Sequence, residues 1–131
     1  MTTFTVKMID HVVLYVQDME RARQFYEQVL GCTLVRHNAK LNLMHLSAGT
    51  SMIDLLPAPE HADGRAGSNV DHVALQIDPF EEDTLIEHLR LNGVEPTAPR
   101  NRFGAGGIGP SLTFQDPDGN TIELKGPAMP S

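Results

Sequence analysis

The sequence predicts an α+β fold built from two copies of one βαβββ unit. Residues 9–16 and 70–77 both read as an apolar residue followed by Asp-His-Val and, after one more residue, Leu. Residues 52–55 and 121–124 each contain an apolar–acidic–leucine triplet. A helical segment that ends in glycine lies between these landmarks in each half, at Gly31 and at Gly93. Repeats that recur in the same order indicate duplication of one supersecondary unit.

The first unit begins with a strand and continues with a helix. Residues 9–16 are mostly β-branched and aliphatic, which favours a strand. Asp18 is a good N-cap for the helix that follows, whose apolar residues recur at helical spacing as far as Leu30. Gly31 can adopt the left-handed conformation that ends such a helix. Three further strands are expected at about 33–37, 41–47 and 51–56.

The second unit repeats this order. Asp78, Pro79 and Glu81 resemble a capping box with proline at the first helical position, and Asn92-Gly93 would end the helix. Three strands are expected at about 94–97, 110–115 and 120–125, the last two joined by the turn Asp116-Pro117-Asp118-Gly119-Asn120.

Two segments are expected to be irregular. Residues 58–69 form a polar connector rich in Pro and Gly, which separates modules at about 8–57 and 70–126. Residues 100–110 contain four glycines, and we expect a movable loop whose Arg100 and Arg102 could meet a substrate carboxylate or phosphate. The whole chain, 1–131, is predicted to be one domain.

Composition excludes several classes of function. The 131 residues include 10 Lys+Arg and 17 Asp+Glu, so the formal charge is −7, and there is no basic stripe for nucleic acid or an anionic membrane. A single cysteine, Cys32, rules out an intrachain disulfide and a thiolate zinc site, and it is expected to be packed. The amino terminus lacks the apolar stretch of a signal peptide, and no apolar run approaches a membrane span, so a cytoplasmic protein is expected.

Strand alternation predicts a cluster of metal ligands. In residues 9–16 and 70–77 the aliphatic side chains of one face would pack under the helix, which leaves His11 and His72 on the opposite face. Asp54 and Glu123 alternate with buried apolar residues in the closing strands and would share that face. Two imidazoles and two carboxylates suit one divalent transition metal: Ni, Zn, Mn, Fe or Co. A structural or solvent-exposed role for each histidine taken alone is the alternative.

The chain resembles the vicinal oxygen chelate superfamily over residues 8–126. The resemblance rests on residues 9–16, on Phe25-Tyr26-Glu27-Gln28-Val29-Leu30-Gly31, and on Asp116-Pro117-Asp118-Gly119-Asn120 with the Thr-Ile-Glu-Leu that follows. It implies that the two modules form an open, incomplete β-barrel around a central cleft. It also implies that His11, Asp54, His72 and Glu123 match the four metal ligands of short bacterial glyoxalase I enzymes. Those enzymes usually carry Glu where Asp54 stands, and the side chain here is shorter by about 1.5 Å.

Glyoxalase-like chemistry is the leading functional prediction. Glu123 would act as the catalytic residue that moves a proton between neighbouring carbons, with glutathione or another thiol as a possible co-substrate. Tyr15 and His45 are expected to line the pocket. Thr113 stands where related extradiol and fosfomycin enzymes place a substrate-contacting aromatic residue.

Three other functions stay open on this scaffold. They are an extradiol dioxygenase with a His-His-Glu site, a fosfomycin thiol transferase, and a non-catalytic protein that binds an antibiotic or another small molecule. Many relatives are homodimers, so a homodimer with a small-molecule substrate is expected. The sequence leaves open whether the four ligands meet within one chain or across two.

Overall fold

The chain folds as two βαβββ units, which confirms the predicted α+β class. The computed structural model describes residues 6–59 and 70–130. Contacts within the chain divide it into two units, Met1–Ala62 and Asp63–Ser131, and each has the order strand, helix and three strands. Most of the predicted connector, 60–69, lies outside the described residues. No helix within the described segments is long and apolar enough to cross a membrane.

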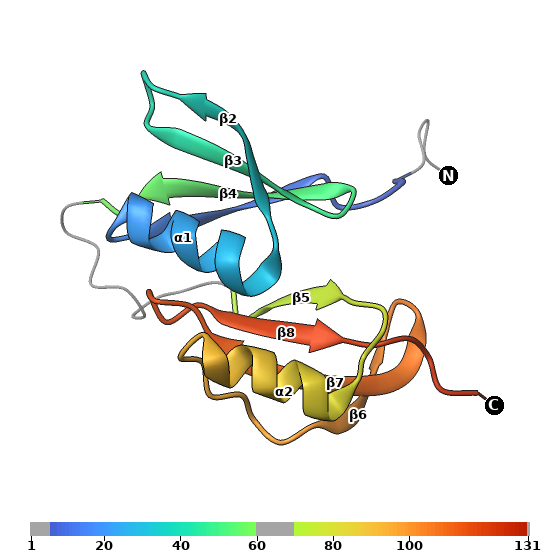
Figure 1. The fold of residues 1–131 in the computed structure, drawn as a ribbon. Helices are drawn as coiled ribbons and strands as arrows, with labels where there is room; N and C mark the ends of the chain where they lie inside the picture. The colour runs from blue at the N-terminus through green and yellow to red at the C-terminus, as the bar shows by residue number, and fades with distance from the viewer. Residues whose placement is uncertain (1–5, 60–69, 131) are drawn as a thin grey trace. The chain divides into compact units, whose positions relative to one another are not determined.

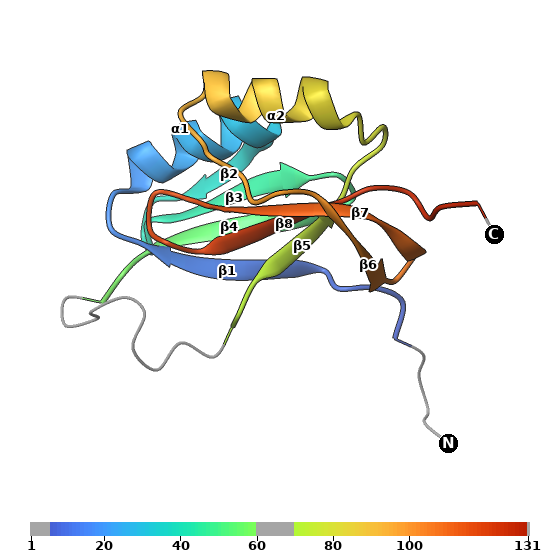
Figure 2. The same ribbon diagram turned by 90° about the horizontal axis from the view of Figure 1, so that it is seen from below.

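The first unit is a four-stranded sheet with one helix on its face (Figures 1 and 2). The sheet order is β1-β4-β3-β2, with β1 parallel to β4 and the other pairs antiparallel. The elements are β1 (His11–Val16), α1 (Met19–Leu30), β2 (Thr33–Asn38), β3 (Leu43–Ala48) and β4 (Ser51–Pro57).

Helix α1 begins and ends as predicted. The Asp18 carboxylate accepts a hydrogen bond from the Arg21 backbone N–H at 3.1 Å, and Gly31 ends the helix at a φ of 72°. The helix buries Ala22, Tyr26 and Val29 against the sheet. The buried aliphatic residues of β1, β3 and β4 complete this core: Leu14, Val16, Met44, Leu46, Ile53 and Leu55.

The second unit repeats this topology with the order β5-β8-β7-β6, and β5 is parallel to β8. Its buried apolar residues are Leu89, Val94, Leu112, Phe114, Ile122 and Leu124. The elements are β5 (Val73–Gln76), α2 (Glu82–Leu91), β6 (Arg100–Gly104), β7 (Gly107–Gln115) and β8 (Thr121–Lys125).

The predicted start of the second helix is wrong. Helix α2 begins at Glu82 with Glu81 as its N-cap and no side-chain capping bond, so Asp78 and Pro79 precede the helix. The backbone N–H of Ile77 still bonds Lys125 O at 2.8 Å, which continues the pairing of β5 with β8. A Cβ at Gly126 would come within 2.5 Å of Phe80 Cβ, so Phe80 packs directly on that glycine. These contacts hold Ile77 and Phe80 against Lys125 and Gly126, and the helix starts only after them.

The expected strand at 94–97 and the expected loop at 100–110 are also wrong. Residues 94–99 contain no strand, and Pro96 and Pro99 cannot donate to a ladder. Residues 100–104 and 107–115 instead pair as the antiparallel hairpin β6–β7. The glycine-rich segment therefore belongs to the sheet.

Candidate metal centre

Each unit places one histidine beside one carboxylate on the sheet face opposite its helix. In the first unit Val13 on β1 pairs with Asp54 on β4, and His11 lies two residues before Val13 on the same face. His11 Nε2 lies 3.9 Å from Asp54 Oδ2. The Asp54 side chain is 2% exposed, whereas that of His11 is 44% exposed. The imidazole is therefore accessible and the carboxylate is buried.

The second unit has the same arrangement in the same register. Ala74 on β5 pairs with Glu123 on β8, and His72 lies two residues before Ala74. His72 Nε2 lies 3.2 Å from Glu123 Oε1, again with a half-exposed imidazole and a buried carboxylate. The longer distance in the first unit agrees with the shorter side chain of Asp54. We call His11–Asp54 and His72–Glu123 the two His–carboxylate pairs.

A second carboxylate holds the other nitrogen of each imidazole. His11 Nδ1 lies 2.7 Å from Asp10 Oδ1, and His72 Nδ1 lies 2.8 Å from Asp71 Oδ2. The contact with Asp10, together with the charge of Asp54, raises the pKa of His11 above its ordinary value, although desolvation opposes this. Metal-binding histidines commonly donate their other ring N–H to a carboxylate, which fixes the tautomer and leaves the free nitrogen for the ion. Both imidazoles have this arrangement.

The second oxygen of each buried carboxylate faces a polar side chain from the next strand. In the second unit Ser111 Oγ donates to Glu123 Oε2 at 2.8 Å. In the first unit His45 Nδ1 lies 3.0 Å from Asp54 Oδ1. Within the described residues neither His45 Nδ1 nor Asp54 Oδ1 has an aligned hydrogen-bond partner, despite the short distance between them. Asp54 is thus a buried carboxylate with one oxygen unsatisfied.

The other predicted site residues lie at several places. Tyr15 is on the His11 face of β1 and is 56% exposed. Thr113 pairs with Glu123 across β7 and β8, and its hydroxyl lies 3.1 Å from Thr97 Oγ1. Arg100 and Arg102 are exposed on β6.

The donor set fits a divalent metal ion. A buried carboxylate oxygen without an aligned hydrogen bond is costly unless a cation or a proton compensates it. Imidazole nitrogens and carboxylate oxygens are ligands that Zn²⁺, Mn²⁺, Fe²⁺, Co²⁺ and Ni²⁺ accept. In the part of the chain that the structure describes, no three His, Cys, Asp or Glu side chains form a metal-holding group. Each unit holds one His–carboxylate pair of such donors.

The sequence reasoning missed Asp10, Asp71 and Ser111. The Asp-His dipeptide recurs in both units, and this repetition is a signal that both residues of the dipeptide have a role. Ser111 carries a weaker signal, because it lies two residues before Thr113 on the same face of β7.

The match to known proteins agrees with this fold. The model of the Glyoxalase/Bleomycin resistance protein/Dioxygenase superfamily matches residues 8–124, and the chain belongs to this superfamily. It is 32% identical to biphenyl-2,3-diol 1,2-dioxygenase 2 of Rhodococcus globerulus over 119 residues, which are 88% of this chain. The chain spans only 60% of the length of that dioxygenase.

Two further relatives match most of their own length. The chain is 32% identical to virulence protein STM3117 of Salmonella typhimurium over 123 residues, which are 91% of this chain and 83% of that protein. The crystal structure of the fosfomycin resistance protein FosX from Listeria monocytogenes, complexed with Mn(II) and sulfate ion, matches with a TM-score of 0.73 and 21% identity. That match covers 95% of this chain and 94% of FosX, and it shows a shared fold.

Proposed function

We propose that this protein is a divalent-metal-dependent enzyme that acts on a small substrate with two adjacent oxygen atoms, in the manner of glyoxalase I. The observation that carries the proposal is the recurrence of one His–carboxylate pair in both units at the same register, each with an outer Asp on the imidazole. We assign His11, Asp54, His72 and Glu123 as metal ligands. Membership of a superfamily that includes glyoxalases and dioxygenases supports this assignment.

Each residue would have its own role in the reaction. A bound divalent ion would polarise a substrate oxygen and stabilise the negative charge that develops there. Glu123 would take a proton from one carbon and return it to the neighbouring carbon, while the Ser111 hydroxyl orients the carboxylate through Oε2. Asp10 and Asp71 would accept the Nδ1 protons of His11 and His72, so that Nε2 of each neutral imidazole is the atom directed at the ion. Tyr15, His45 and Thr113 would contact the substrate.

Metal content and turnover of variants test this assignment. The purified protein is stripped, reloaded in turn with Ni²⁺, Zn²⁺, Mn²⁺, Fe²⁺ and Co²⁺, and analysed for bound metal. It is then assayed with the hemithioacetal of methylglyoxal and glutathione, whose product would be a lactoyl thioester. We expect His72→Ala to lose metal, and Glu123→Gln to keep much of the metal while losing turnover. Glu123→Gln with undiminished activity would refute the role of Glu123.

A ring-cleaving dioxygenase is the second candidate. The 32% identity to biphenyl-2,3-diol 1,2-dioxygenase 2 favours it, and a His-His-carboxylate site suits Fe²⁺ oxygenases. Oxygen uptake by the Fe²⁺-loaded protein with catechols distinguishes it from the first candidate. Stoichiometric ligand binding without turnover in either assay would instead identify a binding protein.

A further inference from the structure

Lys125 is a buried ammonium group on the same face of the sheet as Glu123. The two residues are separated by one residue on β8, so their side chains project to the same side. Lys125 is 4% exposed. Its Nζ donates to Gly107 O at 2.9 Å and lies 3.5 Å from Gly126 O. These backbone carbonyls are its only polar partners within the described residues, so its positive charge has no carboxylate counterion there.

Lys125 belongs to a polar row that crosses all four strands of the second sheet. Gln76 on β5 pairs with Lys125 on β8, Lys125 with Ser111 on β7, and Ser111 with Arg100 on β6. Directly paired residues project to the same face of a sheet. The bond from Ser111 to Glu123 fixes which face this is. The row therefore carries two positive charges on the same sheet face as the His72–Glu123 pair.

The tip of the β6–β7 hairpin encloses one end of this row. A Cβ added at Gly104 would come within 3.1 Å of Lys125 Cε, and a Cβ added at Gly106 would come within 3.3 Å of Gln76 Nε2. The hairpin backbone thus lies directly against the ends of these two side chains because these positions have no side chains of their own. A side chain at either position would have to displace these flexible ends by a few tenths of an ångström.

We propose that Gln76, Lys125 and Arg100 bind a negatively charged group of the substrate, a carboxylate or a phosphate, on the sheet face that carries the His72–Glu123 pair. This inference rests on the proposed function, since it makes the substrate an oxyanion that also carries two adjacent oxygens. Lys125 has three N–H donors and uses at most two on carbonyls. Arg100 adds a planar guanidinium, and Gln76 adds an amide that can donate. A buried cation without a counterion is stabilised when an anion binds beside it.

The test compares two ligands that differ by one carboxylate group. Catechol and 3,4-dihydroxybenzoate both present adjacent hydroxyls, but only the second carries a carboxylate. Their affinities for the Zn²⁺-loaded full chain are measured by calorimetry, and Zn²⁺ avoids redox chemistry. We expect wild type to prefer the benzoate by about tenfold or more, as one charge-assisted hydrogen bond provides. Lys125→Met and Arg100→Met should each remove most of this preference and leave catechol binding unchanged.

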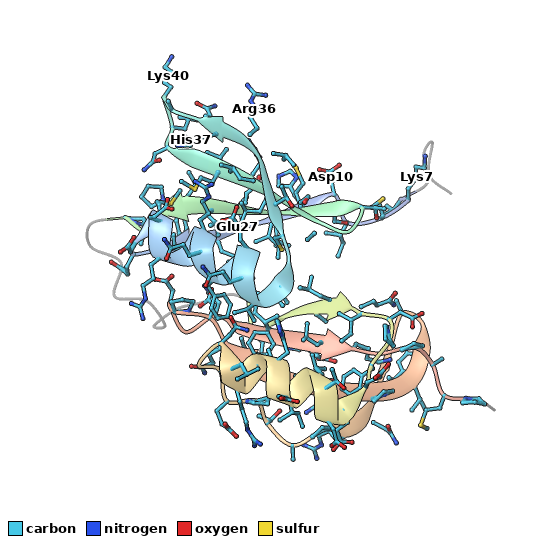
Figure 3. All side chains as sticks on the ribbon, viewed as in Figure 1. Lys7, Asp10, Glu27, Arg36, His37 and Lys40 are labelled. Carbon is cyan, nitrogen blue, oxygen red and sulfur yellow. The ribbon has the colours of Figure 1, made fainter. Side chains whose placement is uncertain are left out.

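Matched controls distinguish the effect of the polar row on ligand preference from a general effect of protein charge. Lys40→Met removes an exposed lysine from the turn between β2 and β3, in the other unit, and should leave the preference intact (Figure 3). Arg100 is exposed, so Arg100→Met retains the test if Lys125→Met fails to fold. Equal affinities of wild type for the two ligands, or equal losses for both ligands in the variants, would overturn the proposal.

An experiment on the metal-free protein distinguishes failure of the proposed anion site from failure of the proposed metal centre. Inorganic phosphate is titrated into the stripped protein and followed by NMR. We expect binding that weakens in Lys125→Met and Arg100→Met and with rising ionic strength. If Zn²⁺ does not bind, but phosphate binds with this dependence on the two variants and on ionic strength, the proposed function fails and the anion site stands. Phosphate binding that is the same in wild type and both variants would reject the anion site.

Discussion

His45 Nδ1 lies 3.0 Å from Asp54 Oδ1, on residues directly opposite each other in the β3–β4 ladder, yet the two atoms are not aligned for a hydrogen bond. Asp54 is thereby flanked by two imidazoles, since its other oxygen faces His11 Nε2. This carboxylate is buried, so its orientation depends on these two neighbours.

Removing His45 should weaken metal binding without abolishing it. Because His45 borders Asp54, we expect His45→Ala to reduce metal affinity about tenfold, as loss of an outer partner of a metal ligand does. His11→Ala removes a ligand and should cost more. The control is His37→Ala, since His37 is exposed on β2 and its Nε2 contacts Asn42 Oδ1 at 2.9 Å (Figure 3). Calorimetric titration with Zn²⁺ measures all three variants, and equal affinities for His45→Ala and wild type would contradict the role of His45.

The outer aspartates should tune the two histidines. Replacing Asp10 by Asn removes the negative charge whose contact raises the pKa of His11, so this pKa should fall in the metal-free protein. At pH 8, where proton competition is small, we expect Asp10→Asn and Asp71→Asn each to weaken Zn²⁺ binding roughly 10- to 100-fold. NMR titration of the imidazole resonances and calorimetry measure the two effects. Asp83→Asn, on the exposed first turn of α2, is the control and should change neither quantity. An unchanged His11 pKa in Asp10→Asn would refute the electrostatic argument.

Ser111 should stabilise the fold through Glu123. Ser111 is fully buried and donates the 2.8 Å bond to Glu123 Oε2, so Ser111→Ala leaves a buried carboxylate oxygen unpaired. We expect a loss of about 1–3 kcal/mol in the free energy of unfolding. Urea unfolding of Ser111→Ala, Glu123→Gln and the double variant measures the coupling between the two residues. Additive losses would show that the hydroxyl contributes nothing through Glu123.

The sequence predicted the pairs because strand alternation and duplication are both local patterns. His11 and His72 face away from aliphatic neighbours, and Asp54 and Glu123 lie between buried residues, so period two alone assigns their face. The number of residues between the histidine and its carboxylate differs between the two units. The register that brings each His to its carboxylate is set by pairing between β1 and β4 and between β5 and β8, which are remote in sequence.

Lys125 and the β6–β7 hairpin escaped prediction for a related reason. Glycines disfavour strands locally, and the contacts of Gly104 and Gly106 with Lys125 and Gln76 come from three different strands and a turn. A lysine at the end of a strand usually lies in solvent, and only its alternation with Glu123 places it on the sheet face opposite α2. Such contacts depend on tertiary packing, which no window of sequence contains.

Substitution of the aspartate before each helix should affect stability differently for α1 and for α2. Asp18 caps α1 through the Arg21 N–H, so Asp18→Ala should cost about 1 kcal/mol of stability. Asp78, the cap expected from the sequence, lies four residues before α2 begins and does not cap this helix. Asp78→Ala should therefore leave the urea midpoint nearly unchanged. A loss for Asp78→Ala as large as that for Asp18→Ala would mean that α2 begins at Pro79 after all.

Cys32 should be an unreactive thiol in the folded protein. It is 7% exposed, and burial, assisted by the charge of Glu27, raises its pKa from 9.0 to about 11. Since the thiolate is the reactive form, its population at pH 8 should be about 100-fold lower than that of an ordinary cysteine. The folded state therefore favours the protonated thiol: this contribution to stability is complete below pH 9.0 and declines as the pH rises towards 11.

Alkylation of Cys32 by iodoacetamide, followed by mass spectrometry, should be at least about 100-fold slower in buffer than in urea. Glu27→Gln should raise the folded rate modestly, because the desolvation of the thiol remains. Equal rates in buffer and in urea would show that Cys32 is accessible in the native state.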